Sequence, residues 1–208
     1  MFQRFFGVRL FVLMVAVVPF LQARDVWVEA KAGYCFVTND VTEDIYGRGS
    51  GVYGAELTGR LWCEGNWYGW MSADYFTKKG HVEDPVAGNY QTKMTLVPLG
   101  FGLKYSQSWG CWDCWSGNWY LGAGVLAAYV KEHVHSPYVI PERSKWGAGG
   151  IVKGGCLIDL SCCVFLDLWL DYSFIKMHFH DSTIPPVVQG RKANVSGCGI
   201  GAGLGYRF

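Results

Sequence analysis

The sequence predicts an all-β fold, namely an eight-stranded antiparallel up-and-down transmembrane β-barrel. Alternation of apolar and polar residues with period two recurs eight times, and neither a helical period nor a second long apolar run follows residue 24. Charged residues make up only 17% of the chain, against about a quarter in soluble domains. A closed barrel is the alternative to helices that satisfies every backbone polar group in lipid.

The start of the chain has the features of a secretory signal peptide. Arg4 and Arg9 give it a basic beginning, residues 10–20 are continuously apolar, and a small residue precedes the expected cut. A membrane anchor is the alternative, but the apolar run is shorter than the roughly 20 residues that a spanning helix needs. We therefore expect residues 1–23 to be a signal peptide and residues 24–208 to form one barrel domain.

The expected mature chain is close to neutral. The 18 basic residues of the whole chain include Arg4 and Arg9, so 16 remain against 17 acidic residues. Binding to the phosphates of nucleic acids requires clusters of Lys and Arg. We therefore expect no nucleic acid partner.

The predicted strands have at least the ~9–11 residues that a tilted membrane-spanning strand requires. In chain order they cover residues 26–37, 52–62, 67–76, 93–105, 119–130, 149–160, 164–175 and 194–208. In each strand, one set of alternate positions (the uncharged parity) carries no charge. The other set (the charged parity) carries all the charged residues of the strands. The charged positions are Glu29, Lys31, Glu56, Arg60, Asp74, Lys104, Lys153, Asp159, Asp167, Asp171 and Arg207.

We expect the uncharged parity to face lipid and the charged parity to face the lumen. A soluble barrel of lipocalin type would reverse the faces, but its outer surface would then carry Trp62, Trp70 and Trp169 and many glycines. Aromatic residues of the uncharged parity gather at strand ends, as in the two girdles of membrane barrels. One predicted girdle holds Trp67, Tyr105, Trp119, Tyr206 and Phe208, and the other holds Tyr34, Phe36, Tyr53, Tyr75, Tyr129, Tyr172 and Phe174.

The connections between the predicted strands alternate in length, as expected for short periplasmic turns and long external loops. The short ones are residues 63–66 and 161–163, and the long ones are residues 38–51, 77–92, 131–148 and 176–193. Residues 106–118 are the exception, because they form a long connection on the short side.

The Gly-rich strands and the chain end resemble a known group of proteins. Residues 99–105, 121–124 and 201–206 echo one another, and alternate apolar residues lead to a terminal Phe208. These segments look like strands of the OmpW-like and opacity-like eight-stranded outer-membrane barrels. The resemblance covers residues 24–208 and implies an outer-membrane location, contact with lipid and recognition by the outer-membrane assembly machinery through Phe208. It does not choose a function, because such families include passive barrels, adhesins and small-molecule conduits.

The inward charges predict a cluster in the lumen. Counting from the short turns places Lys153 opposite Asp171 and Glu56 opposite Asp74. Symmetry about the first long loop places Lys31 beside Glu56. We expect a structural plug of buried ion pairs, because small barrels fill their interior with side chains. The alternative is a path for protons or ions.

The last strand has five inward glycines, which leave space in the lumen. They are Gly197, Gly199, Gly201, Gly203 and Gly205. We expect Phe165 and Trp169 on the preceding strand to lean into this space. The alternative is a groove for an apolar ligand lined by Trp62, Trp70 and Trp169.

Eight cysteines form an unusual feature for such a barrel, and five of them map to the periplasmic turns. These disulfide candidates are Cys63, Cys111, Cys114, Cys162 and Cys163, whereas Cys35, Cys156 and Cys198 map to strands. Exported thiols meet an oxidising compartment, and an odd number suggests cross-links between molecules. Disulfide-linked envelope proteins are therefore expected partners. Cys111 and Cys114 have the spacing of redox and zinc sites but lack the βαβ context of a thioredoxin.

All five histidines map to predicted external loops: His81, His133, His135, His178 and His180. Two pairs at i, i+2 could hold zinc or copper, but we expect ordinary polar loop residues and neither metal nor cofactor. His180, Asp181 and Ser182 are adjacent in sequence, and adjacency alone does not make a catalytic triad. We therefore expect no enzyme.

Together these features predict a largely plugged barrel with a structural or surface-contact role through its external loops. One alternative is a narrow channel for small apolar solutes. Another is a surface adhesin, which rests on loop length and on Tyr46, Tyr138 and Trp146.

Overall fold

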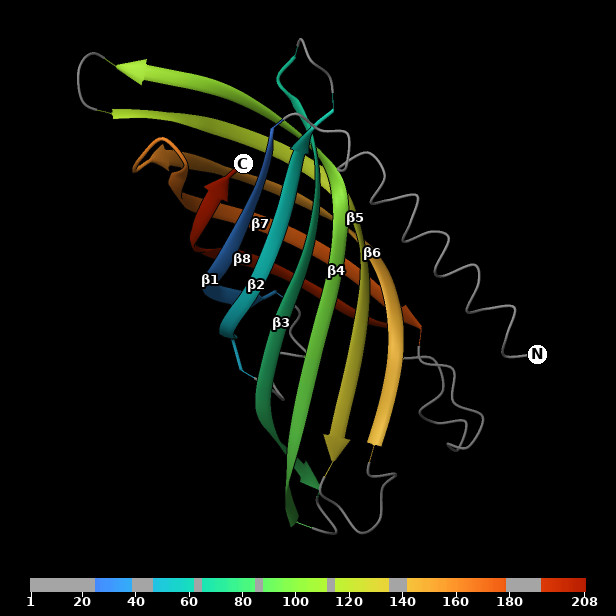
Figure 1. The fold of residues 1–208 in the computed structure, drawn as a ribbon. Helices are drawn as coiled ribbons and strands as arrows, with labels where there is room; N and C mark the ends of the chain where they lie inside the picture. The colour runs from blue at the N-terminus through green and yellow to red at the C-terminus, as the bar shows by residue number, and fades with distance from the viewer. Residues whose placement is uncertain are drawn as a thin grey trace.

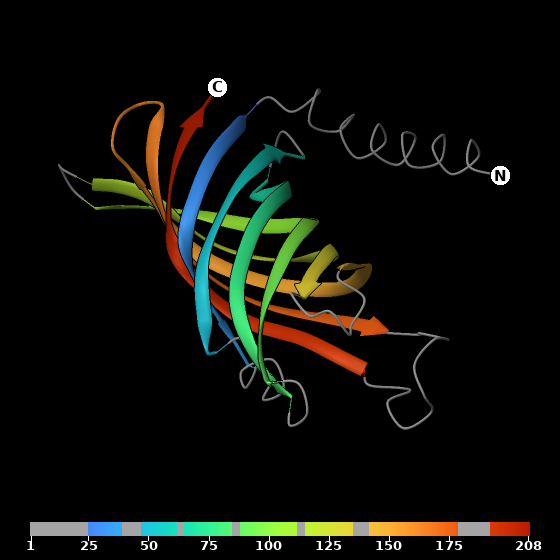
Figure 2. The ribbon, with the colours of Figure 1, turned by 90° about the horizontal axis from the view of Figure 1, so that it is seen from below.

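The computed structural model describes residues 25–38, 47–61, 65–84, 88–111, 115–134, 142–178 and 192–208. These residues form eight antiparallel strands that pair in chain order and close into one barrel, with β1 against β8 (Figures 1 and 2). The strands are β1 (Val26–Val37), β2 (Gly49–Arg60), β3 (Trp67–Asp84), β4 (Gly88–Cys111), β5 (Trp115–Val134), β6 (Glu142–Asp159), β7 (Val164–His178) and β8 (Lys192–Arg207). The predicted fold class is confirmed.

Several predicted loops are in fact strand. Residues 77–84 and 88–92 belong to a long β3–β4 hairpin, so the long loop predicted at 77–92 is wrong. The exceptional connection at 106–118 is also wrong, because pairing continues from Ser106↔Tyr120 to Cys111↔Trp115. Outside the membrane both faces of a strand meet water, so the alternation fades while the backbone ladder continues.

The β4–β5 hairpin projects beyond the neighbouring turns at the end of the barrel that carries the start of β1 and the end of β8 (Figure 1). The β2–β3 and β6–β7 turns lie at the same end. Connections here are short, whereas β1–β2 and β7–β8 are joined at the other end by residues 38–48 and 179–191. We call the two ends periplasmic and external, after the arrangement of membrane barrels.

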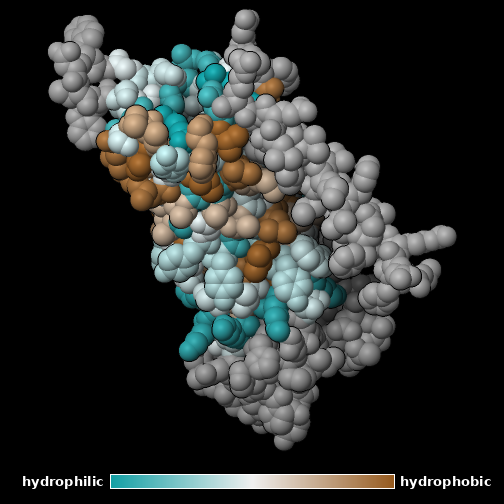
Figure 3. Space-filling model, in the orientation of Figure 1, coloured by the Kyte–Doolittle hydropathy of each residue, from teal (hydrophilic) through white to brown (hydrophobic). Residues whose placement is uncertain are grey.

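The outer face of the barrel carries an apolar band, and hydrophobic side chains of one side of it are visible in Figure 3. The uncharged parity supplies this face, and its large side chains are 41–60% exposed at Leu99, Phe101, Leu103, Leu121, Val125, Val152, Leu168, Leu170, Ile200 and Leu204. Such a surface would be unstable in water over this extent. Lipid is the environment that it fits.

Aromatic rings border this band at both ends. At the periplasmic end, the ring of Tyr105 lies 5.4 Å from that of Trp67 and 5.9 Å from that of Trp119. At the external end, the rings of Tyr34 and Phe36 lie 4.9 Å apart. Both predicted girdles are therefore present among the described residues.

The β3–β4 ladder is interrupted in the middle of the wall. Pairing runs to Ala73↔Leu99 and resumes at Phe76↔Leu96. Pro98 lies in the gap and has no N–H to donate. The barrel wall therefore has fewer backbone hydrogen bonds at this point than on either side.

The predicted signal peptide lies outside the described residues. In the part of the chain that the structure describes, no helix has the length and apolar character required to cross a membrane.

Candidate functional site: an ionic plug and a cavity in the lumen

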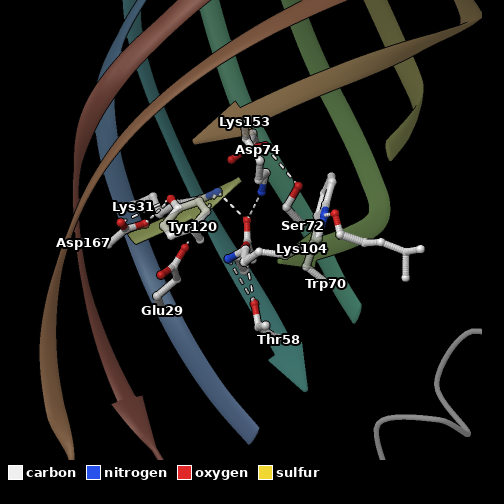
Figure 4. Close-up of polar contacts among 12 residues, drawn as sticks. Glu29, Lys31, Thr58, Trp70, Ser72, Asp74, Lys104, Tyr120, Lys153 and Asp167 are labelled. Atoms are coloured by element: carbon white, nitrogen blue, oxygen red, sulfur yellow. Dashed lines mark hydrogen bonds and ion pairs between the residues drawn. The ribbon is translucent and has the colours of Figure 1, made fainter. Parts of the chain in front are cut away.

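The lumen is organised in three layers. The periplasmic layer is a cluster of buried rings and aliphatic side chains, namely Trp27, Tyr68, Tyr120, Leu157 and Phe165. The external layer is a larger apolar cluster that includes Trp70, Phe76, Leu96, Leu126, Ile151 and Ile175. Charged side chains occupy the layer between them (Figure 4). The ionic groups are thus covered by apolar side chains on both sides.

The centre of the ionic layer is the Glu56 carboxylate, which binds three lysines from three other strands. Its Oε2 accepts from Lys31 at 2.9 Å, and its Oε1 accepts from Lys104 at 2.6 Å. Lys153 binds Oε2 as well. The side chains of Glu56 and Lys104 are 1% and 0% exposed. We call these four residues the ionic plug.

Aromatic rings support the lysines of the ionic plug, and a hydroxyl supports its carboxylate. The Lys104 ammonium lies 4.3 Å from the ring centroid of Tyr120, and the Lys153 ammonium lies 3.7 Å from that of Trp70. Thr58 donates to Glu56 at 3.2 Å. Cation–π contacts strengthen when they are desolvated, so these rings stabilise charges that water does not reach.

Two further acids lie beside the ionic plug. Asp167 is fully buried and accepts a hydrogen bond from the Tyr120 hydroxyl at 2.9 Å. Glu29 is 2% exposed, and its carboxylate oxygens have no hydrogen-bond partner among the described residues. The nearest ion-pair contact of Glu29 is the Lys31 ammonium at 4.0 Å.

The predicted cluster is correct in part. Lys153 pairs with Asp171 across β6 and β7 as predicted, although its ammonium turns to Glu56. Glu56 opposite Asp74 is wrong, because Glu56 pairs with Ser72. Lys31 lies opposite Gly54, so Glu56 is its diagonal neighbour on the same face of β2, and the predicted contact between the two is present at 2.9 Å.

The prediction also missed residues of this layer. Lys104, Glu29 and Asp167 were assigned to the lumen by parity but were not placed in the cluster. Lys104 comes from β4, which is not a neighbour of β2 in the sheet. Strand-by-strand counting reaches only neighbouring strands, so it could not find this contact.

The glycine stripe of β8 is filled by rings from β7. A Cβ atom at Gly205 would lie 2.1 Å from the ring of Phe165, and one at Gly201 would lie 2.6 Å from the ring of Trp169. Phe165 is fully buried. Gly201 and Gly205 thus give room to these rings, as expected, whereas Gly197 and Gly199 line the lumenal cavity described next.

A cavity of about 70 Å³ lies between the ionic plug and the external end of the barrel. Its walls are mostly apolar, with Val37, Val52, Phe76, Leu96, Leu126 and Ile151 among them. Lys31, Asp74 and Asp171 line its charged side, and Pro98 and Trp169 also contribute. Of the predicted tryptophan lining, Trp169 is therefore at the cavity. Trp70 instead donates to the Leu103 carbonyl at 3.2 Å, and Trp62 lies outside the described residues.

The cysteines for which the structure gives a side chain are free thiols, namely Cys35, Cys156, Cys162, Cys163 and Cys198. Cys63 and Cys114 lie outside the described residues, as does the side chain of Cys111. The histidine side chains also fall outside them. Among the described residues, no group of three or more His, Cys, Asp or Glu is arranged to hold a metal ion.

Comparison with known proteins gives matches in structure only. No family model and no curated protein matches the sequence. Neisserial surface protein A matches with a TM-score of 0.56 at 15% identity, over 88% of this chain and 97% of that one. The outer-membrane protein OprG of Pseudomonas aeruginosa gives 0.53 at 16% identity, over 89% and 97%. Ail, the attachment invasion locus protein of Yersinia pestis, gives 0.50 at 11% identity, over 88% and 98%.

These neighbours are small outer-membrane barrels, and this chain has the same overall fold. The apolar band and the two aromatic girdles agree with that likeness, because they are the features that a barrel presents to lipid. The chain thus has the fold of the small outer-membrane β-barrels and an outer face that suits lipid.

Proposed function

We propose that this protein is a largely plugged barrel with a structural or surface-contact role, and that it does not pass polar solutes through its lumen. The observation that carries the proposal is the ionic plug. Its four side chains, which come from β1, β2, β4 and β6, are between 0% and 8% exposed.

The cost of opening the plug supports a closed state. A polar path would have to separate Glu56 from its lysines, and breaking a buried ion pair costs about 3–5 kcal/mol. It would also have to wet the apolar clusters above and below the plug. Eight-stranded barrels generally leave an interior just wide enough for side chains.

The test is solute flux through the reduced, refolded barrel in lipid vesicles. We expect a small sugar to enter no faster than it enters empty vesicles, and a wide porin in the same lipid provides the positive control. Sugar flux well above the empty vesicles would contradict the proposal.

A narrow conduit for small apolar solutes is the second candidate, and two observations favour it. The cavity beyond the plug has mostly apolar walls, and Pro98 lines it at the interruption of the β3–β4 ladder. A solute that entered from the external end would reach the part of the wall where the β3–β4 ladder is interrupted. The route would lead into the membrane and leave the plug closed.

A matched pair of substitutions separates this candidate from the first. Leu126→Trp fills the cavity, whereas Leu168→Trp adds the same ring on the lipid face, where Leu168 is 46% exposed. If the conduit exists, uptake of a small apolar compound exceeds that of empty vesicles and falls only with Leu126→Trp. Equal uptake by both variants and the parent would exclude it.

The surface-contact part of the proposal concerns external loops that lie outside the described residues. Adhesion is one form that such contact could take, and one structural neighbour is named as an attachment protein. Deletion of residues 135–141, which include Tyr138, tests this in a host-cell binding assay. Unchanged binding would remove this loop from the proposal.

A further inference from the structure

The β6–β7 turn carries two adjacent thiols at the periplasmic end of the barrel. The turn is tightly closed, because the N–H groups of Leu160 and Ser161 donate to the Val164 carbonyl at 2.9 and 3.1 Å. The Sγ atoms of Cys162 and Cys163 lie 3.4 Å apart, and both thiols are free. Cys162 is exposed and Cys163 is partly buried.

These two thiols are poorly placed to bond to each other. Neighbouring Cα atoms lie about 3.8 Å apart across a trans peptide, whereas those of disulfide-bonded cysteines lie about 4.4–6.8 Å apart. An internal bond would therefore distort the turn. Cys35 lines the lumenal cavity, and Cys156 and Cys198 have the outward parity of the wall, so none of these three points toward the turn.

We propose that Cys162 joins two copies of this chain through an intermolecular disulfide. Two copies that span one membrane in the same orientation hold their β6–β7 turns at the same depth. A two-fold axis along the membrane normal then brings each Cys162 to the same residue of the second copy. The turn, residues 160–164, contains no charged residue, so charge repulsion does not oppose the contact.

The number of cysteines at this end supports a link between chains. Residues 63, 111, 114, 162 and 163 are the five cysteines of the periplasmic connections and strand ends. Pairing within one chain leaves at least one of five thiols unpaired. Among the thiols whose side chains the structure describes, Cys162 is the exposed one, which makes it accessible to another molecule.

The chemistry is a thiol–disulfide exchange with a disulfide-bearing oxidant. The Cys162 thiolate attacks the oxidant to give a mixed disulfide, and the thiolate of the second copy displaces the remaining sulfur. One Sγ–Sγ bond forms, the disulfide of the oxidant breaks, and the oxidant leaves with two electrons and two protons. Oxidised glutathione can serve in vitro.

The rate should depend on pH. The hydrogen bond with Cys163 raises the pKa of the Cys162 thiol, and only the thiolate attacks a disulfide. The thiolate fraction rises about tenfold per pH unit below the pKa. Cross-linking should therefore be about 30 times faster at pH 8.5 than at pH 7.

The experiment uses the mature chain refolded in lipid vesicles, treated with oxidised glutathione and separated on a non-reducing gel. We expect a band of twice the monomer mass that disappears on reduction. Cys162→Ser should lose this band, and Cys198→Ser, which removes a thiol from the outer wall, should keep it. Heat-modifiable migration on the same gels reports that each variant is folded.

Three results would overturn the proposal. The first is a parent protein that stays monomeric under oxidation, and the second is a dimer that persists in Cys162→Ser. The third comes from isolated envelopes. If the reducible adduct in isolated envelopes has a mass other than twice that of the chain, the disulfide of Cys162 joins this chain to another envelope protein.

Discussion

Replacement of Glu56 by Gln tests the ionic plug most directly. The substitution keeps the shape of the side chain but leaves Lys31, Lys104 and Lys153 without their shared counter-ion. One ion pair at about 4 Å amounts to about 4 kcal/mol at the effective dielectric constant of ~20 that suits proteins. Loss of one partner of a buried pair costs about 3–5 kcal/mol in measured cases. We expect a loss of that size and not three times as much, because Lys31 can turn toward Glu29 at 4.0 Å.

The assay is urea unfolding of the refolded barrel in lipid vesicles, followed by tryptophan fluorescence, with the free energy extrapolated to zero urea. Trp27 and Trp70 are buried in the lumen and report its opening. Asp25→Asn is the control, because its ion pair with Arg60 joins side chains that are 50% and 33% exposed. Such exposed pairs contribute about 0–1 kcal/mol. If Glu56→Gln costs no more than this control, the reasoning about the plug is refuted.

Three further predictions use the same preparations. Lys31→Met should lower the free energy of unfolding by about 1.5–3 kcal/mol, less than Glu56→Gln, since two lysines remain on the carboxylate; an unchanged urea midpoint would remove Lys31 from the plug. Gly205→Ala should cost about 1–3 kcal/mol through overpacking, because its Cβ would meet the facing phenylalanine ring at 2.1 Å, whereas Gly110→Ala meets no atom within 4 Å and should leave the midpoint in place. Deletion of Phe208 should slow membrane insertion in cells, measured as unfolded protein in the periplasm, and normal insertion would argue against its recognition by the assembly machinery.

The sequence by itself determined the all-β class, the number of strands and the face of each residue within the predicted strands. The bounds of β1 match the prediction at both ends, and the lipid-facing leucines and the lumenal charges fall on the predicted sides. This information is local, because each strand lies between lipid and lumen, and its own alternation decides which side chains enter which medium. The packing of Phe165 and Trp169 against the glycines of β8 could be predicted from the sequence as well, because β7 and β8 are neighbouring strands.

Tertiary structure alone decided the register and the contacts across the lumen. The prediction placed Asp74 opposite Glu56, whereas the partner of Glu56 is Ser72, two residues away. The error arose in the β2–β3 turn, because a turn has no periodic pattern that fixes the register. The binding of Glu56 to Lys104 and Lys153 joins strands that do not touch in the sheet. Such contacts depend on how the strands tilt and close, and on the reach of long side chains into a narrow interior. The pattern along a strand specifies the medium that a residue faces, whereas barrel closure specifies which residues meet there.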